Sequence, residues 1–316
     1  MIEYMKNLKY SLLSLYFMEN LDDWRKAGKI TGQTLSYGRT LIKKGASYLE
    51  VTEKIEKKIA ELGGQCAFPP QMALNDVAAH FTVEPGQDII VDDQIISLDC
   101  GIHVNGAIGD SAITVDLSGR NAALVKASEE ALQAALKTLK SGNFRLGAIG
   151  KAIEDAITAR GFQPVRNLSG HGLKLFEVHA PPTIPNYDTK DATELKKDAC
   201  YAIEPFATTG AGLIYEQEDA QIFSFVEKRP VRSQITREIL KEIEAYKGLP
   251  FTTRWLAKKH PVFKVNFALK ELIRAGVLHS YPPLPDKSHG LVSQAEHSIY
   301  IDSDGKIEIL TLRDDE

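Results

Sequence analysis

Apolar and polar residues recur along the chain at spacings that predict helices and strands in two similar blocks. The first block has helical spacing of apolar residues from Asn20 to about Gly45 and again from Tyr48 to Leu62. Ser47 and Glu50 have the spacing of a capping box, which marks the start of the second helix. We therefore expect a pair of helices near the beginning of the chain.

The second block repeats this order after an apolar hairpin. Residues 121–140 and 146–160 show the spacing of apolar residues that predicts helices, and Gly161 marks the end of the second helix. Short strands are expected at Gly170–Val178, Ala199–Thr208 and Ser293–Ile301, with an irregular connection at Pro181, Pro182 and Pro185. Together the two blocks predict an α+β fold in which helices cover an antiparallel sheet.

The hairpin between Ile95 and Val115 is the clearest local prediction. Asn105-Gly106 is typical of a two-residue turn with positive φ at both positions. This turn fixes the register of the two strands that it joins, because the pairing counts back from it residue by residue.

That register places two carboxylates on one face of the sheet. Asp99 lies opposite Ala112, and Asp110 lies opposite Gly101. Asp99 and Asp110 are then diagonal neighbours about 7 Å apart, and such a pair resists burial unless a cation lies between the carboxylates. Either both side chains face solvent or they bind a metal ion. A solvated pair is the usual arrangement, but the apolar strands around these aspartates favour burial, so the sequence supports the two alternatives about equally. Cys100 points to the opposite face and is expected in the core.

Composition places the chain among soluble globular proteins. It has 316 residues, of which 43% are hydrophobic and 25% are charged. The net charge of −4 argues against a protein built wholly around nucleic acid. Cys66, Cys100 and Cys200 lie far apart without CxxC spacing, so neither a disulfide framework nor a structural zinc site is indicated. A reducing cytoplasm is the expected location.

Residues 1–19 are expected to form an N-terminal extension. The apolar run Tyr10–Phe17 lacks a small-residue cleavage site and is too short to span a bilayer, so we expect no membrane association. Met1 and Met18 are both candidate start residues.

Residues 227–287 differ from the rest of the chain in charge. They contain 13 lysines or arginines and 6 acidic residues, a local charge of +7, so the remaining residues sum to −11. Three short helical patterns follow one another at 235–246, 252–259 and 262–275. This order predicts a winged-helix-like subdomain inserted into one larger domain, formed by residues 20–226 and 288–316.

Polar residues interrupt the other predicted strands. Glu204 and Glu296 each break an apolar run, and His171 lies between two glycines. Alone, a glutamate at a strand end is usually solvated and a single histidine is usually structural. Together with Asp99 and Asp110, they make four carboxylates and one imidazole, a set whose repulsion two divalent cations would relieve. Such ligands suit Mn, Fe(II), Co or Zn.

These residues lie in motifs that resemble those of the methionine aminopeptidases of the pita-bread fold, specifically the type 2 class. The motifs are FPPQMALNDVAAHF with His80, the hairpin 98–115, LSGHGL with His171, EVHAPP with His179, YAIEPFAT with Glu204 and SQAEHSIY with Glu296. The resemblance runs from about Asn20 to the C-terminus. It implies that residues 20–226 and 288–316 form a pita-bread catalytic domain.

The resemblance implies a centre with two divalent metal ions. By analogy, Asp99 chelates one ion, and Asp110 and Glu296 bridge both. His171 and Glu204 complete the second site. A hydroxide held between the ions would be the nucleophile, because two-metal sites lower the pKa of bound water and stabilise the oxyanion that forms. Glu204 is also implied as the proton acceptor.

The resemblance also assigns residues around the metals. His179 would hydrogen-bond the scissile carbonyl, and His80 would meet the substrate near its amino terminus, where fumagillin-type epoxides react in the family. Phe68, Val178 and Tyr281 match the walls of the methionine pocket. Judged without the family, His80 would be a structural histidine and the other three would be core residues.

The implied function is removal of the initiator methionine from nascent proteins whose second residue is small, by a monomeric enzyme. Prolidases and aminopeptidase P resemble the same metal pattern but cleave before proline; Tyr281, fifteen residues before Glu296, favours the methionine enzyme. Ile222 departs from the eukaryotic members, which place a histidine there.

A third alternative is a noncatalytic ribosome or nucleic-acid binder. The +7 insertion supports it, whereas the complete set of five ligands opposes it. Contact with ribosomes through the basic insertion is a hypothesis of its own, and no DNA partner is expected.

Overall fold

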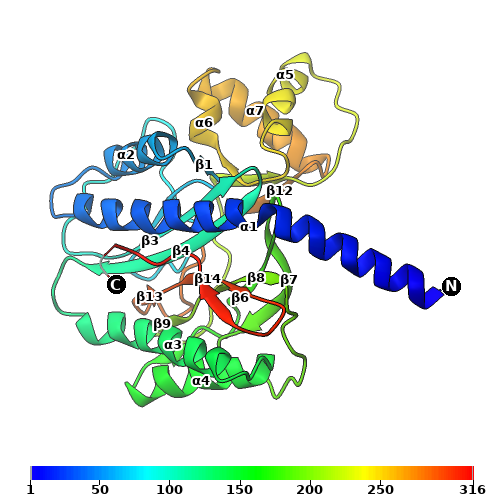
Figure 1. Ribbon diagram of the computed structural model, residues 1–316. Coiled ribbons are helices and arrows are strands. Elements are labelled where there is room, and N and C mark those ends of the chain that lie inside the picture. The colour runs from blue at the N-terminus through cyan, green and yellow to red at the C-terminus, as the bar shows by residue number, and fades with distance from the viewer. Residues whose placement is uncertain (1, 315) are drawn as a thin grey trace.

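The chain forms two halves, in each of which a pair of helices packs against antiparallel sheet, with a smaller group of helices and strands beside them (Figure 1). The computed structural model describes residues 2–314 and 316, and side chains from residue 21 onward. The expected α+β fold is confirmed. Within the described residues, no helix combines the length and the apolarity needed to cross a membrane.

The first half consists of two helices packed on a four-stranded antiparallel sheet. Its elements are α1 (Ile2–Leu41), α2 (Tyr48–Glu61), β1 (Gln65–Cys66), β2 (Gln71–Leu74), β3 (Ile95–Val104) and β4 (Ala107–Asp116). Both helices turn their apolar stripes toward β3, where Ile55, Leu98 and Ile102 share one buried cluster. The predicted helix pair is confirmed, and Ser47 caps α2 by accepting a hydrogen bond from the backbone of Glu50.

The β3–β4 hairpin has the predicted register. Asn105 and Gly106 both have positive φ, 52° and 98°. Asp99 lies opposite Ala112, and Asp110 lies opposite Gly101. Cys100 is fully buried in the core, as its position in the strand predicts.

The second half places two helices against a five-stranded sheet and a three-stranded sheet. The helices are α3 (Ala122–Lys140) and α4 (Leu146–Ala159). The five-stranded sheet has the order β15 (Ile307–Ile309), β14 (His297–Ile301), β8 (Ala199–Ile203), β6 (Ser169–Lys174) and β7 (Glu177–Pro185). The smaller sheet has the order β13 (Val292–Gln294), β9 (Phe206–Thr208) and β5 (Gln163–Pro164).

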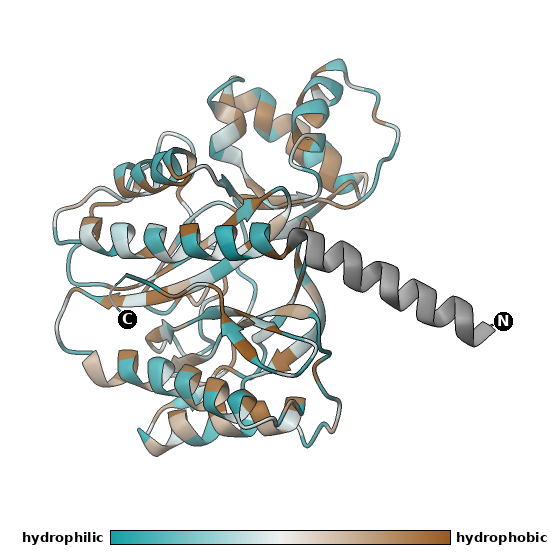
Figure 2. Cartoon of the chain, viewed as in Figure 1, coloured by the Kyte–Doolittle hydropathy of each residue, from teal (hydrophilic) through white to brown (hydrophobic). Residues whose placement is uncertain are grey.

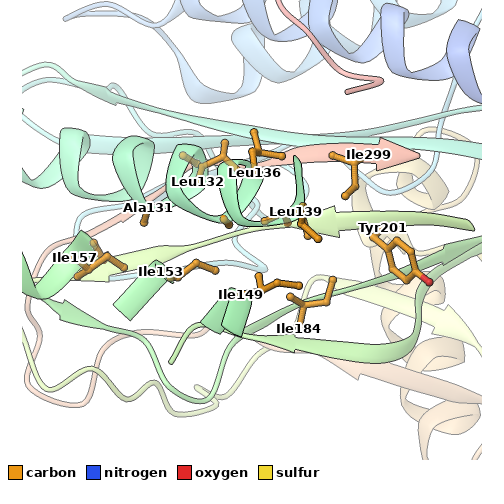
Figure 3. Close-up of a cluster of buried hydrophobic side chains, with 14 of the residues drawn as sticks. Ala131, Leu132, Leu136, Leu139, Ile149, Ile153, Ile157, Ile184, Tyr201 and Ile299 are labelled. Carbon is orange, nitrogen blue, oxygen red and sulfur yellow. The ribbon is translucent and has the colours of Figure 1, made fainter. Parts of the chain in front are cut away.

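Apolar side chains of α3 and α4 form the core of this half. Figure 3 shows Leu136, Leu139 and Ile149 from the helices packed with Tyr201 and Ile299 from the sheet. In Figure 2 both helices carry hydrophilic and hydrophobic residues in alternation along their ribbons, as expected of helices with one face in the core. This packing holds β8 and β14 in place, the strands that lead into Glu204 and away from Glu296.

Several predicted boundaries are wrong. The first helix begins at Ile2, not near Asn20, because no glycine or proline precedes Gly28 to end it. Residues 1–19 therefore lie in α1 apart from residue 1, which is outside the described residues; the side chains of this extension, including Met18, are not described.

The predicted strand at residues 170–178 is instead the hairpin β6–β7, and β7 includes the three prolines that were expected in an irregular connection. β7 is the edge strand of its sheet, so residues that cannot donate a backbone hydrogen bond are tolerated there. Each of the other two predicted strands is broken in two, at Glu204-Pro205 and at Ala295-Glu296.

The third group of elements packs around its own apolar core. It contains β10 (Ile222–Phe225), α5 (Gln234–Glu244), β11 (Phe251–Thr252), α6 (Thr253–Ala257), α7 (Val262–Arg274) and β12 (Leu278–Tyr281). The three predicted helices are present, and the strands form a sheet of order β11–β10–β12. β10 precedes residue 227, so this sheet draws on chain outside the predicted insertion; the domain boundaries stay a prediction.

Candidate metal centre

Five polar side chains predicted as ligands come from both halves of the fold. Asp99 and Asp110 lie on the adjacent strands β3 and β4, and His171 lies on β6. Glu204 follows β8 and Glu296 precedes β14, each at a break between strands. Nε2 of His171 lies 3.4 Å from Oε1 of Glu204 and 3.8 Å from Oδ2 of Asp110. Asp110, His171 and Glu296 offer ligand atoms that all lie within 4.8 Å of one another.

Close approach of neighbouring strands puts His171 in this position. A Cβ atom at Gly170 would lie 2.4 Å from the carbonyl oxygen of Ala202, and one at Gly172 would lie 2.5 Å from that of Pro181. The two glycines therefore let β8 and β7 approach β6 on both sides of the histidine.

The carboxylates repel one another in surroundings with little solvent. Asp110 and Glu296 are only 3% and 2% exposed. Burial, reinforced by the charge of Asp99, holds the pKa of Asp110 well above its usual value. Burial and the neighbouring carboxylates likewise raise the pKa values of Glu204 and Glu296, and burial raises the pKa of Asp99 to about 7.

The imidazole of His171 is held neutral and correctly oriented for a metal. Burial lowers its pKa to about 3. A proton on Nδ1 donates to the carbonyl oxygen of Gly172 at 3.2 Å, which leaves the lone pair of Nε2 directed at Asp110 and Glu204. A backbone acceptor on the far nitrogen is the usual way in which proteins orient a histidine ligand.

This donor set fits divalent metal ions. Oδ1 of Asp99 and Oδ1 of Asp110 are buried without a hydrogen-bond partner, and no lysine or arginine in the described part of the chain forms an ion pair with the four carboxylates. Buried charges of one sign require compensation. Four carboxylates and one imidazole provide oxygen ligands with one nitrogen, which suits Mn, Fe(II), Co and Zn.

A cavity of about 280 Å³ opens onto the candidate metal centre. All five predicted ligands line it, together with Phe68, His80, His179 and Tyr281. Val178 does not; it is buried in the same apolar cluster as Phe68. A Cβ atom at Gly101, opposite Asp110, would lie 2.1 Å from the ring of Phe68, so glycine makes room for that ring beside the ligands.

Aromatic and histidine rings cluster at one side of the cavity. The ring of His179 lies 4.7 Å from that of His171 and 6.0 Å from that of Tyr281. The rings of His80 and Tyr281 are 5.3 Å apart. Burial lowers the pKa of His80 to about 3 and that of His179 to about 4, so both rings are neutral at pH 7.

His80 lies outside the helices and strands. Its φ of 63° is left-handed, a conformation that costs about 1–3 kcal/mol in a residue other than glycine. The backbone N–H of His80 donates to Oε1 of Gln71 at 2.5 Å. Gln71 itself pairs with Asp99 across β2 and β3, so this bond ties His80 to the metal centre.

Several cavity residues were not predicted from the sequence. The cavity is also lined by Gln71, Asn167, Phe206, Pro250 and His279. His279 lies two residues before Tyr281 on β12, so alternation alone places both side chains on one face of the strand. The position of His279 could therefore have been predicted from the sequence. The position of Pro250 at the cavity depends on tertiary packing, which local patterns do not specify.

The chain belongs to metallopeptidase family M24, whose model matches residues 22–239. It is 45% identical to a methionine aminopeptidase of Archaeoglobus fulgidus over 282 residues, which covers 89% of this chain and 94% of that relative. It is 40% identical to a methionine aminopeptidase of Thermococcus onnurineus, over 89% of this chain and 96% of the relative. The family predicted from the motifs is confirmed.

Solved structures share the fold at low sequence identity. A thermophilic Arx1 superimposes with a TM-score of 0.79 at 15% identity, covering 92% of this chain and 90% of that one. A methionine aminopeptidase of Thermotoga maritima has a TM-score of 0.67 at 22% identity, covering 93% and 97%. A prolidase of Pyrococcus horikoshii has a TM-score of 0.56 at 16% identity, covering 94% and 62%. The pita-bread fold is thereby confirmed.

We predict that the metal-free protein loses stability as the pH rises above about 6.5. The folded carboxylates keep protons that the unfolded chain, with carboxyl pKa values near 4, has already released. Their contribution is therefore lost as the pH rises through the folded pKa values, the lowest being about 7 for Asp99. Each retained proton corresponds to about 1.4 kcal/mol per pH unit. The thermal midpoint of chelator-treated protein measures the loss.

Three histidines of the cavity, His80, His171 and His179, leave this slope unchanged. They stabilise the fold above their unfolded pKa of 6.5, and this contribution is lost only as the pH falls below it. Saturation with Mn²⁺ should flatten the slope, because metal ions displace the protons. Equal slopes with and without Mn²⁺ would contradict the assignment.

Proposed function

We propose that this chain removes the N-terminal methionine from nascent proteins whose second residue is small, using two divalent metal ions. The observation that carries the proposal is the convergence of Asp99, Asp110, His171, Glu204 and Glu296 on one cavity. Two relatives, at 45% and 40% identity, are methionine aminopeptidases that the chain matches over nearly their full length. Co, Mn, Fe(II) and Zn all suit the ligand set, which does not choose between them.

The cavity can hold one side chain and the adjoining peptide group. Its volume of about 280 Å³ is near the lower end of ligand pockets, roughly 300–1,000 Å³. Phe68 and Tyr281 provide aromatic walls for a flexible thioether. His80 lies against Tyr281 and would meet the substrate near its amino terminus, and Val178 supports the pocket from within the cluster that includes Phe68.

When bound, two divalent ions would lower the pKa of a water molecule and stabilise negative charge on the scissile carbonyl oxygen. Glu204 accepts the proton of the attacking water and passes it to the leaving amine. Its place in the cavity beside His171 suits this role, because a general base must lie within hydrogen-bond reach of the proton that it accepts. Neutral His179 donates a hydrogen bond to the carbonyl oxygen as charge develops there.

Prolidase activity is the nearest alternative. Prolidases share the fold of this chain. The prolidase of Pyrococcus horikoshii, however, is only 16% identical to it, and the present chain covers 62% of that protein. A noncatalytic binder is less well supported, because all five ligand side chains are present and converge. We also propose that the reaction takes place in the cytoplasm, where reducing conditions keep the three cysteines as free thiols.

Hydrolysis of Met-Ala-Ser, Met-Leu-Ser and Ala-Pro-Ser separates these activities. With Mn²⁺ added to metal-depleted protein, we expect rapid release of methionine from Met-Ala-Ser only. Chelation should abolish the reaction, and Glu204→Gln should reduce kcat by at least 100-fold, because the general base is removed. Cleavage of Ala-Pro-Ser alone would establish the prolidase instead, and no metal-dependent cleavage of any peptide would support the noncatalytic alternative.

His179→Ala should lower kcat for Met-Ala-Ser by about 100- to 1,000-fold with little change in KM. A hydrogen bond that strengthens in the transition state contributes to kcat and not to ground-state binding. Steady-state kinetics at saturating Mn²⁺ measure both constants. His103→Ala is the matched control, since that buried histidine lines a different cavity. A tenfold rise in KM with unchanged kcat would instead assign His179 to substrate binding.

The basic insertion provides a surface for contact with ribosomes, which we propose as the partner. Several of its cations are already neutralised within the chain; Arg254 pairs with Glu56 of α2, and Lys259 pairs with Glu242 of α5. On α7, by contrast, three cations form no ion pair in the described part of the chain: Lys264, Lys270 and Arg274. Phe263 and Phe267 lie on the same helix and are 70% and 54% exposed.

Simultaneous replacement of Lys264, Lys270 and Arg274 by alanine should weaken co-sedimentation with ribosomes. Each cation that neutralises a phosphate contributes about 0.7–0.9 to the slope of log affinity against log salt, so the slope should fall by about 2–3. A triple alanine variant of α3 is the charge-matched control, with Lys126, Lys137 and Lys140 replaced. Equal salt-dependent binding of both variants and the wild type would exclude α7 as the contact.

A further inference from the structure

A second cavity lies where the three parts of the fold meet. Its volume is about 380 Å³, compared with about 280 Å³ at the candidate metal centre, and ligand pockets span roughly 300–1,000 Å³. The first half contributes α2, β1 and the β3–β4 hairpin to its walls, and the second half contributes the β6–β7 turn. The third group of elements contributes the segment after α5 and the helix α6. Among the described residues, none lines both cavities.

Aromatic rings form much of the wall of this second cavity. The rings of Tyr246 and Trp255 are 5.6 Å apart, and those of His103 and Phe176 are 5.5 Å apart. The indole is held in place, because Nε1 of Trp255 donates to Oε1 of Glu56 at 2.7 Å. Aromatic rings attract one another in offset and edge-to-face arrangements beyond the effect of buried area. The walls therefore suit a ligand that contains a flat aromatic ring.

One positive charge on this wall is not compensated by the protein. Of the two charged lining residues, Glu56 is ion-paired with Arg254 and Lys258. The other is Lys247, which forms no ion pair with any residue that the structure describes. Its ammonium lies 4.5 Å from the centroid of the Phe176 ring. A single cation beside aromatic walls favours a ligand with one negative charge.

A buried histidine supplies a second unused donor. His103 is 8% exposed, and its Nδ1 accepts a hydrogen bond from the backbone N–H of Gly106 at 3.3 Å. Burial, together with the charge of Lys247, lowers the pKa of His103, so the ring is neutral and its one proton lies on Nε2. Within the described part of the chain, Nε2 has no hydrogen-bond partner. Because His103 and Lys247 both lie against the ring of Phe176, the two donors are near each other.

We propose that the second cavity binds a small aromatic carboxylate. The ring of the ligand lies among Phe176, Tyr246 and Trp255, and its carboxylate accepts hydrogen bonds from Lys247 and from Nε2 of His103. A carboxylate suits these donors because it is an acceptor-only group with a single negative charge. A phosphate ester fits less well, since it carries a charge of about −1.5 to −2 at pH 7 and the wall offers one cation. This site is separate from the metal centre, so its residues take no part in peptide hydrolysis.

Isothermal titration with 2-naphthoate and with its neutral amide, 2-naphthamide, tests the requirement for charge. The full chain is used after metal depletion, so that the carboxylate cannot bind a metal ion instead. We expect 2-naphthoate to bind about three- to fivefold more tightly than 2-naphthamide, as for an ion pair with a partly exposed lysine.

Lys247→Met should abolish the preference for the carboxylate. Methionine removes the cation but, like lysine, is unbranched at Cβ, so the left-handed backbone at this position (φ 56°) accepts both equally. Lys241→Met is the matched control; this exposed lysine of α5 lies outside the cavity, and its replacement should leave the preference intact.

Two further variants identify the cavity that holds the ligand. Phe176→Leu removes a ring from the second cavity and should weaken the binding of both compounds at least threefold. His279→Ala removes a ring from the cavity at the metal centre and should leave both affinities unchanged.

Circular dichroism of each variant shows whether it has folded. The proposal is overturned if the wild type binds neither compound at about 1 mM, a weak affinity for a ligand of this size, or binds both equally. Loss of binding in His279→Ala but not in Phe176→Leu would also overturn it, because the ligand would then lie beside the metal centre. If Phe176→Leu does not fold, the charge preference of Lys247→Met decides. Peptidase activity enters none of these measurements, so failure of the proposed function is a separate result.

Discussion

Mutual repulsion among four buried carboxylates must be offset before the two halves of this fold can pack around them. One cavity is lined by all four carboxylates, those of Asp99, Asp110, Glu204 and Glu296. The neutral imidazole of His171 lies beside two of them, Asp110 and Glu204. Transfer of ionised carboxylates from water into such surroundings is costly, and their proximity adds to that cost. Protons or metal ions must offset it, and only metal ions do so while the carboxylates remain ionised.

Two separately packed sheets hold this unfavourable cluster together. The β3–β4 hairpin, with α1 and α2, fixes the two aspartates, while the five-stranded sheet, with α3 and α4, fixes His171 and the ends of the strands beside Glu204 and Glu296 (Figure 1). Burial of the apolar side chains under each sheet stabilises the fold and offsets the free-energy cost of the buried carboxylates. The sheet of the helical group forms a third wall of the cavity, since Ile222, His279 and Tyr281 come from it.

Local patterns predicted those parts of the site that depend on local geometry. Asn105-Gly106 fixed the hairpin turn, and the register placed Asp99 and Asp110 correctly. The break at Glu204 was visible because a charged residue interrupts an apolar run, although the split into two strands was not predicted. The prolines of β7 were wrongly expected in an irregular connection, because an edge strand tolerates them and the edge position of a strand follows from the whole sheet. Pro250 was missed for a similar reason, since only tertiary packing brings it to the cavity.

Anomalous diffraction from crystals soaked in Mn²⁺ shows whether metal ions bind among these carboxylates. We expect two anomalous peaks inside the cavity, both in contact with Asp110 and Glu296, with His171 coordinating one of them through Nε2. Peaks only at the protein surface, or none beside these side chains at saturating Mn²⁺, would contradict it.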